Sequence, residues 1–228
     1  MKVTYYGHSC FGIEAAGKQL LFDPFVTPNE LAKHIDVNQI PADFILLSHG
    51  HEDHTADLLS VARRTNATVV ATWEIYVWLG KQGITNMHPM NAGGSWTFDF
   101  GKVKMIYAHH SSSLADGTYA GSAGGFVVET GGMTFYYSGD TALFSDMTLI
   151  TERFKLDFAF LPIGSNFTMD VEDAITASGY IKCKKIIGMH YDTFGFIKID
   201  HAEAMRKFKS AGLELILMDI GQTIDVNG

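Results

Sequence analysis

The sequence predicts an α/β fold in which two β-sheets face each other and helices cover the outer faces. Runs of β-branched and aromatic residues with glycine-containing turns dominate residues 95–140, which is typical of strands. Strand-like and helix-like runs alternate near residues 43–72 and again after residue 145, which is typical of layered α/β proteins. No Pro- or Ser-rich linker divides the 228 residues. We therefore expect one domain over residues 1–228, long enough to bury a substantial core.

The first half of the chain begins as a meander and continues as strand–helix units. Gly7 and Ala16-Gly17 separate the opening strand-like runs, and "DFILLSH" is a continuous apolar run, typical of a strand buried on both faces. We expect strands at residues 2–7, 10–15, 18–25, 43–49 and 68–72. Helical spacing predicts helices at residues 29–35, 55–65 and 74–83, the last ended by Gly83.

The second half begins with strands and then alternates. After "NAGG", short runs of high β-propensity predict strands at residues 95–100, 102–110, 124–130 and 133–140. The last third predicts helices at residues 145–154, 171–181 and 200–212. Between and after these helices, apolar runs predict strands at residues 156–164, 184–190 and 213–219.

Charge and composition exclude several classes of function. Lys plus Arg number 17 against 25 Asp plus Glu, a formal net charge of −8, which disfavours nucleic acid and anionic membranes as partners. No apolar run approaches the ~18 to 20 residues that span a bilayer, and the N-terminus alternates like a strand rather than a signal peptide. A cytoplasmic protein with free thiols at Cys10 and Cys183 and a small-molecule substrate is expected. The oligomeric state is left open, a homo-oligomer included.

The segment "SHGHEDH", residues 48–54, concentrates metal-binding chemistry. His49 and His51 are two positions apart, so in an extended segment they project to the same side. Asp53 and His54 follow where the chain turns into a helix, and they can approach from another direction. Imidazole and carboxylate without thiolate suit Zn, Mn, Fe or Ni. The segment could therefore place two ligands on one metal and two on a neighbouring one.

Further ligand-type residues stand at the ends of predicted strands. They are His109-His110 after "KVKMIYA", Asp140 after "MTFYYSG" and His190 after "KKIIGM". Strand ends followed by loops are where a rigid scaffold presents functional groups. Because adjacent residues on a strand point opposite ways, only one of His109 and His110 can face a site. His110 is preferred because it stands at the loop edge before "SSS".

These residues resemble those of a known family. "SHGHEDH" matches the H-x-H-x-D-H signature of the metallo-β-lactamase superfamily, and His110, Asp140 and His190 follow in that family's ligand order. The resemblance covers essentially the whole chain and implies a four-layer αββα sandwich with the site at one edge. "GHSCFGIE", "LLFDPF", "GDTALFSDM" and "FLPIGSNFTM" are similar to small bacterial single-domain metal-dependent hydrolases near the ascorbate-6-phosphate lactonase branch.

The resemblance implies a role for each site residue. The first metal would be held by His49, His51 and His110, and the second by Asp53, His54 and His190, with Asp140 bridging both. His8 in "YYGHSC" and Asp23 in "FDPF" would support the ligands, since an Asp that accepts a ligand histidine's other N–H fixes its tautomer. Asp53, Asp140 and His8 are the expected catalytic residues. The loops beside the ligands supply the candidate substrate contacts Ser111, Ser112, Asn166, Phe167, Tyr191 and Thr193.

Other positions narrow the family's range of chemistry. Position 51 is His where oxygen-reducing di-iron members carry Glu, and position 140 is Asp where many zinc β-lactamases carry Cys. Redox iron chemistry and dedicated antibiotic hydrolysis are thus disfavoured. Three remaining histidines and all three tryptophans are expected to have structural roles: His34, His88, His201, Trp73, Trp78 and Trp96.

The predicted function is that of a dinuclear metal-dependent hydrolase with a metal-bridging hydroxide. Two divalent ions, zinc before Mn, Fe or Ni, would generate hydroxide at neutral pH and polarise the scissile group. A lactone or related ester of a small metabolite is the leading substrate class. A phosphodiesterase acting on a small phosphodiester is the alternative, and a non-catalytic metal-binding or sensing module is the alternative of another class.

Overall fold

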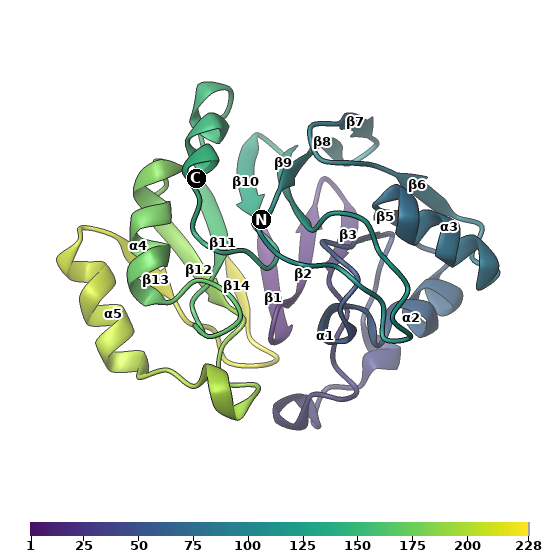
Figure 1. Cartoon of the computed structure of the whole chain (residues 1–228), viewed down its shortest axis with the longest axis horizontal. Coiled ribbons are helices and arrows are strands. Elements are labelled where there is room, and N and C mark those ends of the chain that lie inside the picture. The colour runs from purple at the N-terminus through teal and green to yellow at the C-terminus, as the bar shows by residue number, and fades with distance from the viewer. Residues whose placement is uncertain (228) are drawn as a thin grey trace.

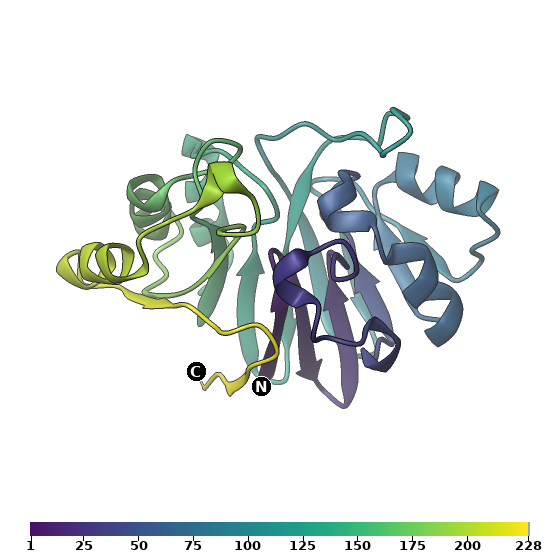
Figure 2. The same ribbon diagram turned by 90° about the horizontal axis from the view of Figure 1, so that it is seen from below.

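Two β-sheets pack face to face in the computed structural model, which describes residues 1–227 (Figures 1 and 2). Within these residues the first sheet has seven strands in the order β14-β1-β2-β3-β4-β5-β6. The strands are β1 (Lys2–Gly7), β2 (Cys10–Ala15), β3 (Lys18–Phe22), β4 (Phe44–Leu46), β5 (Thr68–Ala71), β6 (Met87–Pro89) and β14 (Thr223–Asp225).

The second sheet, built from the middle and last parts of the chain, also has seven strands in the described residues. Their order is β13-β12-β11-β10-β9-β8-β7. The strands are β7 (Ser95–Phe98), β8 (Gly101–Tyr107), β9 (Gly124–Thr130), β10 (Met133–Tyr137), β11 (Phe158–Pro162), β12 (Lys185–Met189) and β13 (Glu214–Ile216).

Helices cover the outer face of each sheet, as the two sides of Figure 1 show. The first sheet is covered by α2 (Leu58–Thr65) and α3 (Trp73–Lys81), and the second by α4 (Val171–Tyr180), α5 (His201–Ser210) and the 3-10 helix η3 (Ser145–Glu152). The single-turn helix α1 (Glu52–Thr55) precedes α2. Shorter 3-10 helices lie in connecting segments: η1 (Glu30–Ala32), η2 (Val37–Gln39) and η4 (Gly195–Ile197). This layering confirms the predicted αββα sandwich.

The central strands carry apolar side chains on both faces because both faces are buried where the sheets and helices pack. In β3, Phe22 packs between the sheets, whereas Leu21 packs under the helices of the first sheet. In β11, Phe160 points into the same central layer, and Leu161 points outward beneath α4. Alternation along a strand sends successive side chains to opposite faces. The apolar run "DFILLSH" is explained in the same way by β4.

Strand direction brings several strand ends to one edge. β3 and β4 are parallel, and β1 runs in the same direction as β3 because each is antiparallel to β2. In the second sheet, β10, β11 and β12 are parallel, and β8 runs with them because β8 and β10 are both antiparallel to β9. The loops that follow β1, β3, β4, β8, β10 and β12 contain the site residues described below.

The structure differs from the predicted elements in several ways. The predicted helix at residues 29–35 is reduced to the 3-10 helix η1, and the one at residues 55–65 begins only at Leu58, after the separate helix α1. The strands β6 and β14 were not predicted, and each has only three residues. The predicted helix at residues 145–154 is the 3-10 helix η3. The predicted strand at residues 18–25 ends at Phe22, because Asp23 turns the chain with a positive φ of 42°. In residues 1–227, no helix is long and apolar enough to cross a membrane.

Candidate metal centre

The segment from Ser48 to His54 forms the middle of the candidate site. After β4 the chain remains extended up to His51, which has φ −61° and ψ 150° and precedes the first turn of α1. His49 and His51 therefore project to one side. The turn of α1 then brings Asp53 and His54 in from another direction, with the His54 N–H donating to the His51 carbonyl at 3.0 Å.

Three imidazoles meet on one side of this segment. His49 Nε2 lies 3.0 Å from His51 Nδ1, and His110 Nε2 lies 3.3 Å from the same atom. Two ligands held at about 2.0–2.1 Å by one tetrahedral zinc ion would be about 3.3 Å apart. The spacing of these three nitrogens therefore suits a single bound cation. His110, which follows β8, reaches the group from the second sheet.

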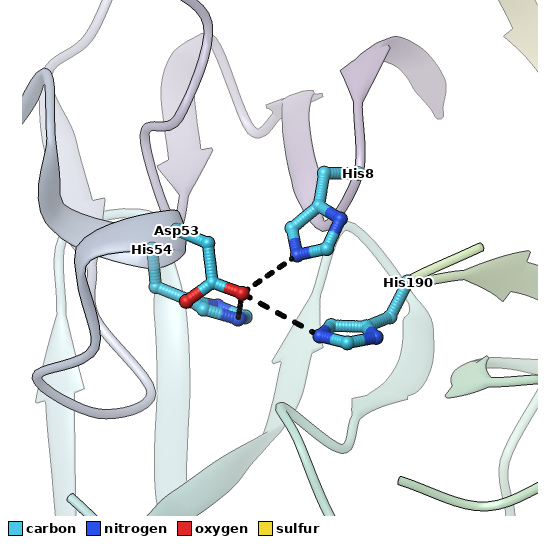
Figure 3. A group of neighbouring side chains, drawn as sticks. All are labelled: His8, Asp53, His54 and His190. Carbon is cyan, nitrogen blue, oxygen red and sulfur yellow. Dashed lines mark hydrogen bonds and ion pairs between the residues drawn. The ribbon is translucent and has the colours of Figure 1, made fainter. Parts of the chain in front are cut away.

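A second group lies beside the first (Figure 3). Asp53 Oδ2 is 3.1 Å from His8 Nε2, 3.6 Å from His190 Nε2 and 3.9 Å from His54 Nε2. The four side chains come from the loop after β1, from α1 and from the loop after β12. The structure thus places His8 close enough to be a ligand itself, in addition to the supporting position expected from the sequence.

Asp140 joins the two groups. Its Oδ2 lies 2.9 Å from His190 Nε2, 3.3 Å from His54 Nε2 and 3.6 Å from His110 Nε2. The carboxylate is buried and reaches the site just after Gly139. Gly139 has φ 59°, and a Cβ there would lie 2.5 Å from the Gly124 carbonyl oxygen. Only glycine therefore allows the turn that delivers Asp140.

Asp23 holds the ligand side chains from behind. It is fully buried, and its Oδ2 accepts hydrogen bonds from His54 Nδ1 at 2.8 Å and from Ser48 Oγ at 2.6 Å. Because the Ser48 hydroxyl donates to Asp23, it accepts from His49 Nδ1 at 2.9 Å. Both histidines thereby turn their Nε2 lone pairs toward the site, the arrangement that metal ligands need. Tyr137 also donates to Asp23 Oδ2, at 2.7 Å.

Three of the site residues have left-handed backbone conformations. His8 and His190 have φ 56°, and Asp23 has φ 42°. Each directly follows the last residue of a strand, so the positive φ turns the chain sharply where the strand ends. Such conformations are uncommon for residues other than glycine, although Asp and His tolerate them better than most. Strain of this kind collects at functional sites.

Carboxylates and imidazoles in the site shift one another's pKa values. Burial disfavours the charged form of every group, yet Asp140 raises the pKa of His54 well above its usual value, and Asp140 with Asp53 raises the pKa of His190 to about 9. The same contacts hold the pKa of Asp140 well below its usual range in spite of burial. Burial lowers the pKa of His49 well below normal. Without a metal ion, protons on His54 and His190 balance the buried carboxylates.

The donor set fits divalent cations. Asp140 Oδ1 is buried and has no hydrogen-bond partner in the described residues, and His54 Nε2 faces Asp140 Oδ2 at 3.3 Å without forming a hydrogen bond. Buried polar atoms are rarely left without a partner, and a bound cation would satisfy both. Neutral imidazoles and ionised carboxylates are also the forms that bind Zn, Mn, Fe or Ni. The residues therefore suit a metal centre, and the two groups together suit a pair of ions.

Comparison with known proteins identifies the family. The family model described as the β-lactamase superfamily domain matches residues 18–191. A metal-dependent hydrolase of the UPF0173 family from Flavobacterium johnsoniae is 54% identical over 226 residues, which cover 99% of this chain and 100% of the relative. The chain belongs to the metallo-β-lactamase superfamily. Within it, the chain belongs to the UPF0173 group, whose members are named metal-dependent hydrolases.

Two solved structures share the fold of this chain. A metallo hydrolase from the hyperthermophilic archaeon Ignicoccus hospitalis is 34% identical, with a TM-score of 0.89, covering 98% of this chain and 97% of that one. An isothiocyanate hydrolase from Delia radicum gut bacteria has a TM-score of 0.82 over 99% of this chain and 98% of that one. Its identity is 20%, so this second likeness shows the fold alone.

The metallo-β-lactamase site opens into a pocket of about 690 Å³. Members of the two ligand groups line it together with the aspartate that joins them: His51, Asp53, His110, His190 and Asp140. Of the predicted substrate contacts, Ser111, Phe167 and Thr193 line this pocket. Phe194, Gly195 and Phe196 complete the wall and were not predicted. Only their nearness to His190 in the sequence could have pointed to them.

The other predicted substrate contacts lie elsewhere. Among the described residues, Ser112, Asn166 and Tyr191 are not part of the pocket wall. Ser112 is buried, where its Oγ accepts from the Gly50 N–H at 3.1 Å. Tyr191 is buried against His201, and Asn166 is exposed next to the Phe167 loop tip. We therefore do not assign a substrate contact to these three residues.

The remaining histidines lie outside the centre. His109 stacks on Phe144 with ring centroids 4.6 Å apart, which leaves His110 as the member of the pair that faces the site. His88 packs against Trp96 and Phe98. His34 and His201 are exposed, and each contacts a surface group: His34 the Ile220 carbonyl and His201 the Asp192 carboxylate.

Proposed function

We propose that the chain is a hydrolase that uses two divalent metal ions to cleave a lactone or a related ester of a small metabolite. The position of Asp140 Oδ2, within 3.6 Å of imidazole nitrogens from both ligand groups, is the observation that most supports a dinuclear centre. Membership of a group named for metal-dependent hydrolysis supports the reaction class. Zinc is the preferred metal, followed by Mn, Fe and Ni, because the donors are imidazole and carboxylate.

Each ligand group has a separate task in this proposal. His49, His51 and His110 would hold one ion, and Asp53, His54 and His190 the other, with Asp140 between them. When bound, the ions supply an activated water at neutral pH and a Lewis acid for the scissile carbonyl. All other tasks belong to the protein's own side chains.

Asp53 is the proposed proton carrier. Its side chain is 25% exposed and lines the pocket, so its carboxylate can accept a proton from water there or donate one to a leaving oxygen. The His8 Nε2–H donates to Asp53 Oδ2 at 3.1 Å, and His8 Nδ1 contacts Thr193 Oγ1 at 3.0 Å. We assign His8 the task of fixing the orientation of Asp53.

The charge of the pocket favours an ester over a phosphodiester. Among the described residues, the wall includes no lysine or arginine. A phosphodiester keeps its negative charge on binding and is usually met by arginine or lysine. An uncharged lactone or ester needs no such partner. The phosphodiesterase alternative would depend on the metal ions alone for charge.

A substrate panel tests the proposal. Protein reconstituted with Zn or Mn is offered simple lactones, aryl esters and bis-p-nitrophenyl phosphate, with Asp140→Ala as the matched variant. We expect lactone or ester hydrolysis that Asp140→Ala lowers by about 100-fold or more, because even partners that only support ligands cost 10–100-fold. Preference for the phosphodiester would favour the alternative substrate class. Metal binding without turnover of any probe would favour a non-catalytic module.

A further inference from the structure

Exposed phenylalanines stand at the entrance of the metal pocket. Phe167 is 49% exposed and Phe196 is 77% exposed, and their ring centroids are 6.4 Å apart. They come from two different loops, one after β11 and one after β12. Phe194 lies deeper in the wall, with its ring 5.3 Å from that of His8. An apolar surface thus extends from the pocket entrance to the ligand groups.

Both loops are fixed at their bases. In the first loop, Met169 is fully buried, and its N–H donates to the Thr141 carbonyl at 3.1 Å. In the second, Ile197 is fully buried and its carbonyl accepts from the Asp192 N–H at 2.8 Å. The Asp192 carboxylate also accepts from the Ile199 N–H. The phenyl rings are therefore presented from anchored turns, which lowers the cost of ordering them on binding.

We propose that Phe167, Phe194 and Phe196 bind an apolar substituent of the substrate and select uncharged lactones or esters that carry an aryl or alkyl group. This inference rests on the proposed function and names its substrate class. Covering exposed apolar rings removes them from water, which is favourable. Because the same wall offers no lysine or arginine within residues 1–227, an anionic substituent gains nothing there. Besides the histidines and aspartates, the polar side chains of this wall are Ser111 and Thr193.

A set of three lactones tests whether the pocket selects an apolar substituent. γ-Butyrolactone, γ-phenyl-γ-butyrolactone and a γ-butyrolactone carrying a carboxylate share one ring and differ only in the substituent. For the metal-loaded protein we expect kcat/KM to be highest for the phenyl compound. The double variant Phe167→Ala, Phe196→Ala should lower that value roughly tenfold and lower kcat/KM for the unsubstituted lactone by a clearly smaller factor. Phe196→Leu should retain most of the preference.

The control is Trp96→Ala. Trp96 is similarly exposed, at 54%, but lies in β7 and outside the metal pocket. The Trp96→Ala variant should have the same kcat/KM as the wild type for all three lactones. Equal losses for all three lactones in the Phe167, Phe196 double variant, or no loss for the phenyl compound, would overturn the proposed selection.

A binding measurement separates this inference from the proposed function. Cyclopentanone and 3-phenylcyclopentanone are uncharged and cannot be hydrolysed, and calorimetry gives their affinities for the metal-loaded protein. We expect the phenyl ketone to bind roughly tenfold more tightly, and the double variant to remove that difference. If no lactone or ester is hydrolysed but this difference is present, the proposed function fails and the apolar subsite stands. If the two ketones bind equally well, the apolar subsite is refuted whatever the activity.

Discussion

At the scale of single residues, Asp23 orients the metal-ligating side chains although it is not itself an expected metal ligand. Its buried carboxylate orients His54 directly and His49 through the Ser48 hydroxyl. A second buried aspartate, Asp57, provides a contrast. Its oxygens accept from the backbone of Val26 and Thr27 and make no contact with a histidine. One carboxylate therefore supports the ligands, and the other supports only a turn.

Asp23→Asn should weaken metal binding much more than Asp57→Asn. The amide would no longer accept all of the hydrogen bonds that fix the two imidazoles, and loss of such a support costs roughly 10–100-fold in metal affinity. Competition with a chromogenic chelator measures this affinity. Asp57→Asn should lower thermal stability while metal affinity stays close to that of the wild type. Equal affinities in Asp23→Asn and the wild type would show that Asp23 has no role in the centre.

Metal binding should release protons near neutral pH. In the metal-free protein His190 has a pKa of about 9, so it is protonated below that pH, whereas a metal ligand must be neutral. The apparent affinity should therefore rise with pH through the neutral range, and the contribution of the His190 proton should end above about 9. Calorimetry in buffers with different ionisation enthalpies counts the released protons. Metal binding without any proton release near neutral pH would contradict the assigned charges.

The residues of the site were more predictable than its wall. Ligand-type side chains at strand ends, such as His110, Asp140 and His190, can be recognised because residue type and position both point to a metal. The positions of Phe194 and Phe196 depend on how the loop after β12 folds, which the sequence pattern does not reveal. The sequence pattern also does not reveal that Ser112 is buried and contacts Gly50. Ser112 was therefore predicted to contact the substrate.

At the scale of elements, long or strongly patterned segments were predictable and short ones were not. β6 has three residues and ends in proline, and it pairs only at the edge of its sheet, where proline is tolerated. β14 is equally short, and it forms a strand because it pairs with β1 from the other end of the chain. Segment 145–154 has helical spacing but forms a 3-10 helix. Such outcomes depend on tertiary contacts rather than on local pattern.

The loop between β4 and α1 depends on the small size of Gly50. A Cβ at this position would lie 2.4 Å from the Ala120 Cβ and 3.2 Å from the Ser113 backbone. Gly50→Ala should therefore push the two loops apart and cost about 1–3 kcal/mol in the free energy of unfolding. Urea denaturation measures this cost.

Gly179→Ala is the matched control, because Gly179 lies inside α4 and, apart from that helix itself, no atom of residues 1–227 would lie within 4 Å of its Cβ. That variant should be neutral, or more stable by up to about 1 kcal/mol. Equal stability of Gly50→Ala and the wild type would show that the loops tolerate the added methyl group.

At the scale of the whole molecule, the two sheets share one apolar layer. Phe22 of the first sheet packs against Phe126, Phe135 and Tyr137 of the second. The chain also returns from the second sheet to the first at β14, so that the Val226 N–H donates to the Met1 carbonyl at 2.8 Å. The ligand groups draw on both sheets as well. Separation of the sheets would therefore dismantle the core and the centre together.

Unfolding should accordingly be a single cooperative transition. Phe22→Ala should lower the free energy of unfolding by about 3–5 kcal/mol. Far-ultraviolet circular dichroism follows the unfolding of all helices and strands. Tryptophan fluorescence follows α3, which covers the first sheet, and β7, which is a strand of the second sheet. The two signals should coincide in the wild type and in the variant. Two separated transitions would indicate that the sheets unfold independently.

The most direct measurement of the central claim is the number of metal ions per chain. Mass spectrometric metal analysis of protein purified without added metal is applied to the wild type and to His49→Ala and His190→Ala, with circular dichroism to verify folding. We predict two ions in the wild type and one in each variant, because each substitution removes a ligand from one group only. A folded wild type that binds fewer than two ions when saturated, or variants that retain both, would contradict a centre built from two groups bridged by Asp140.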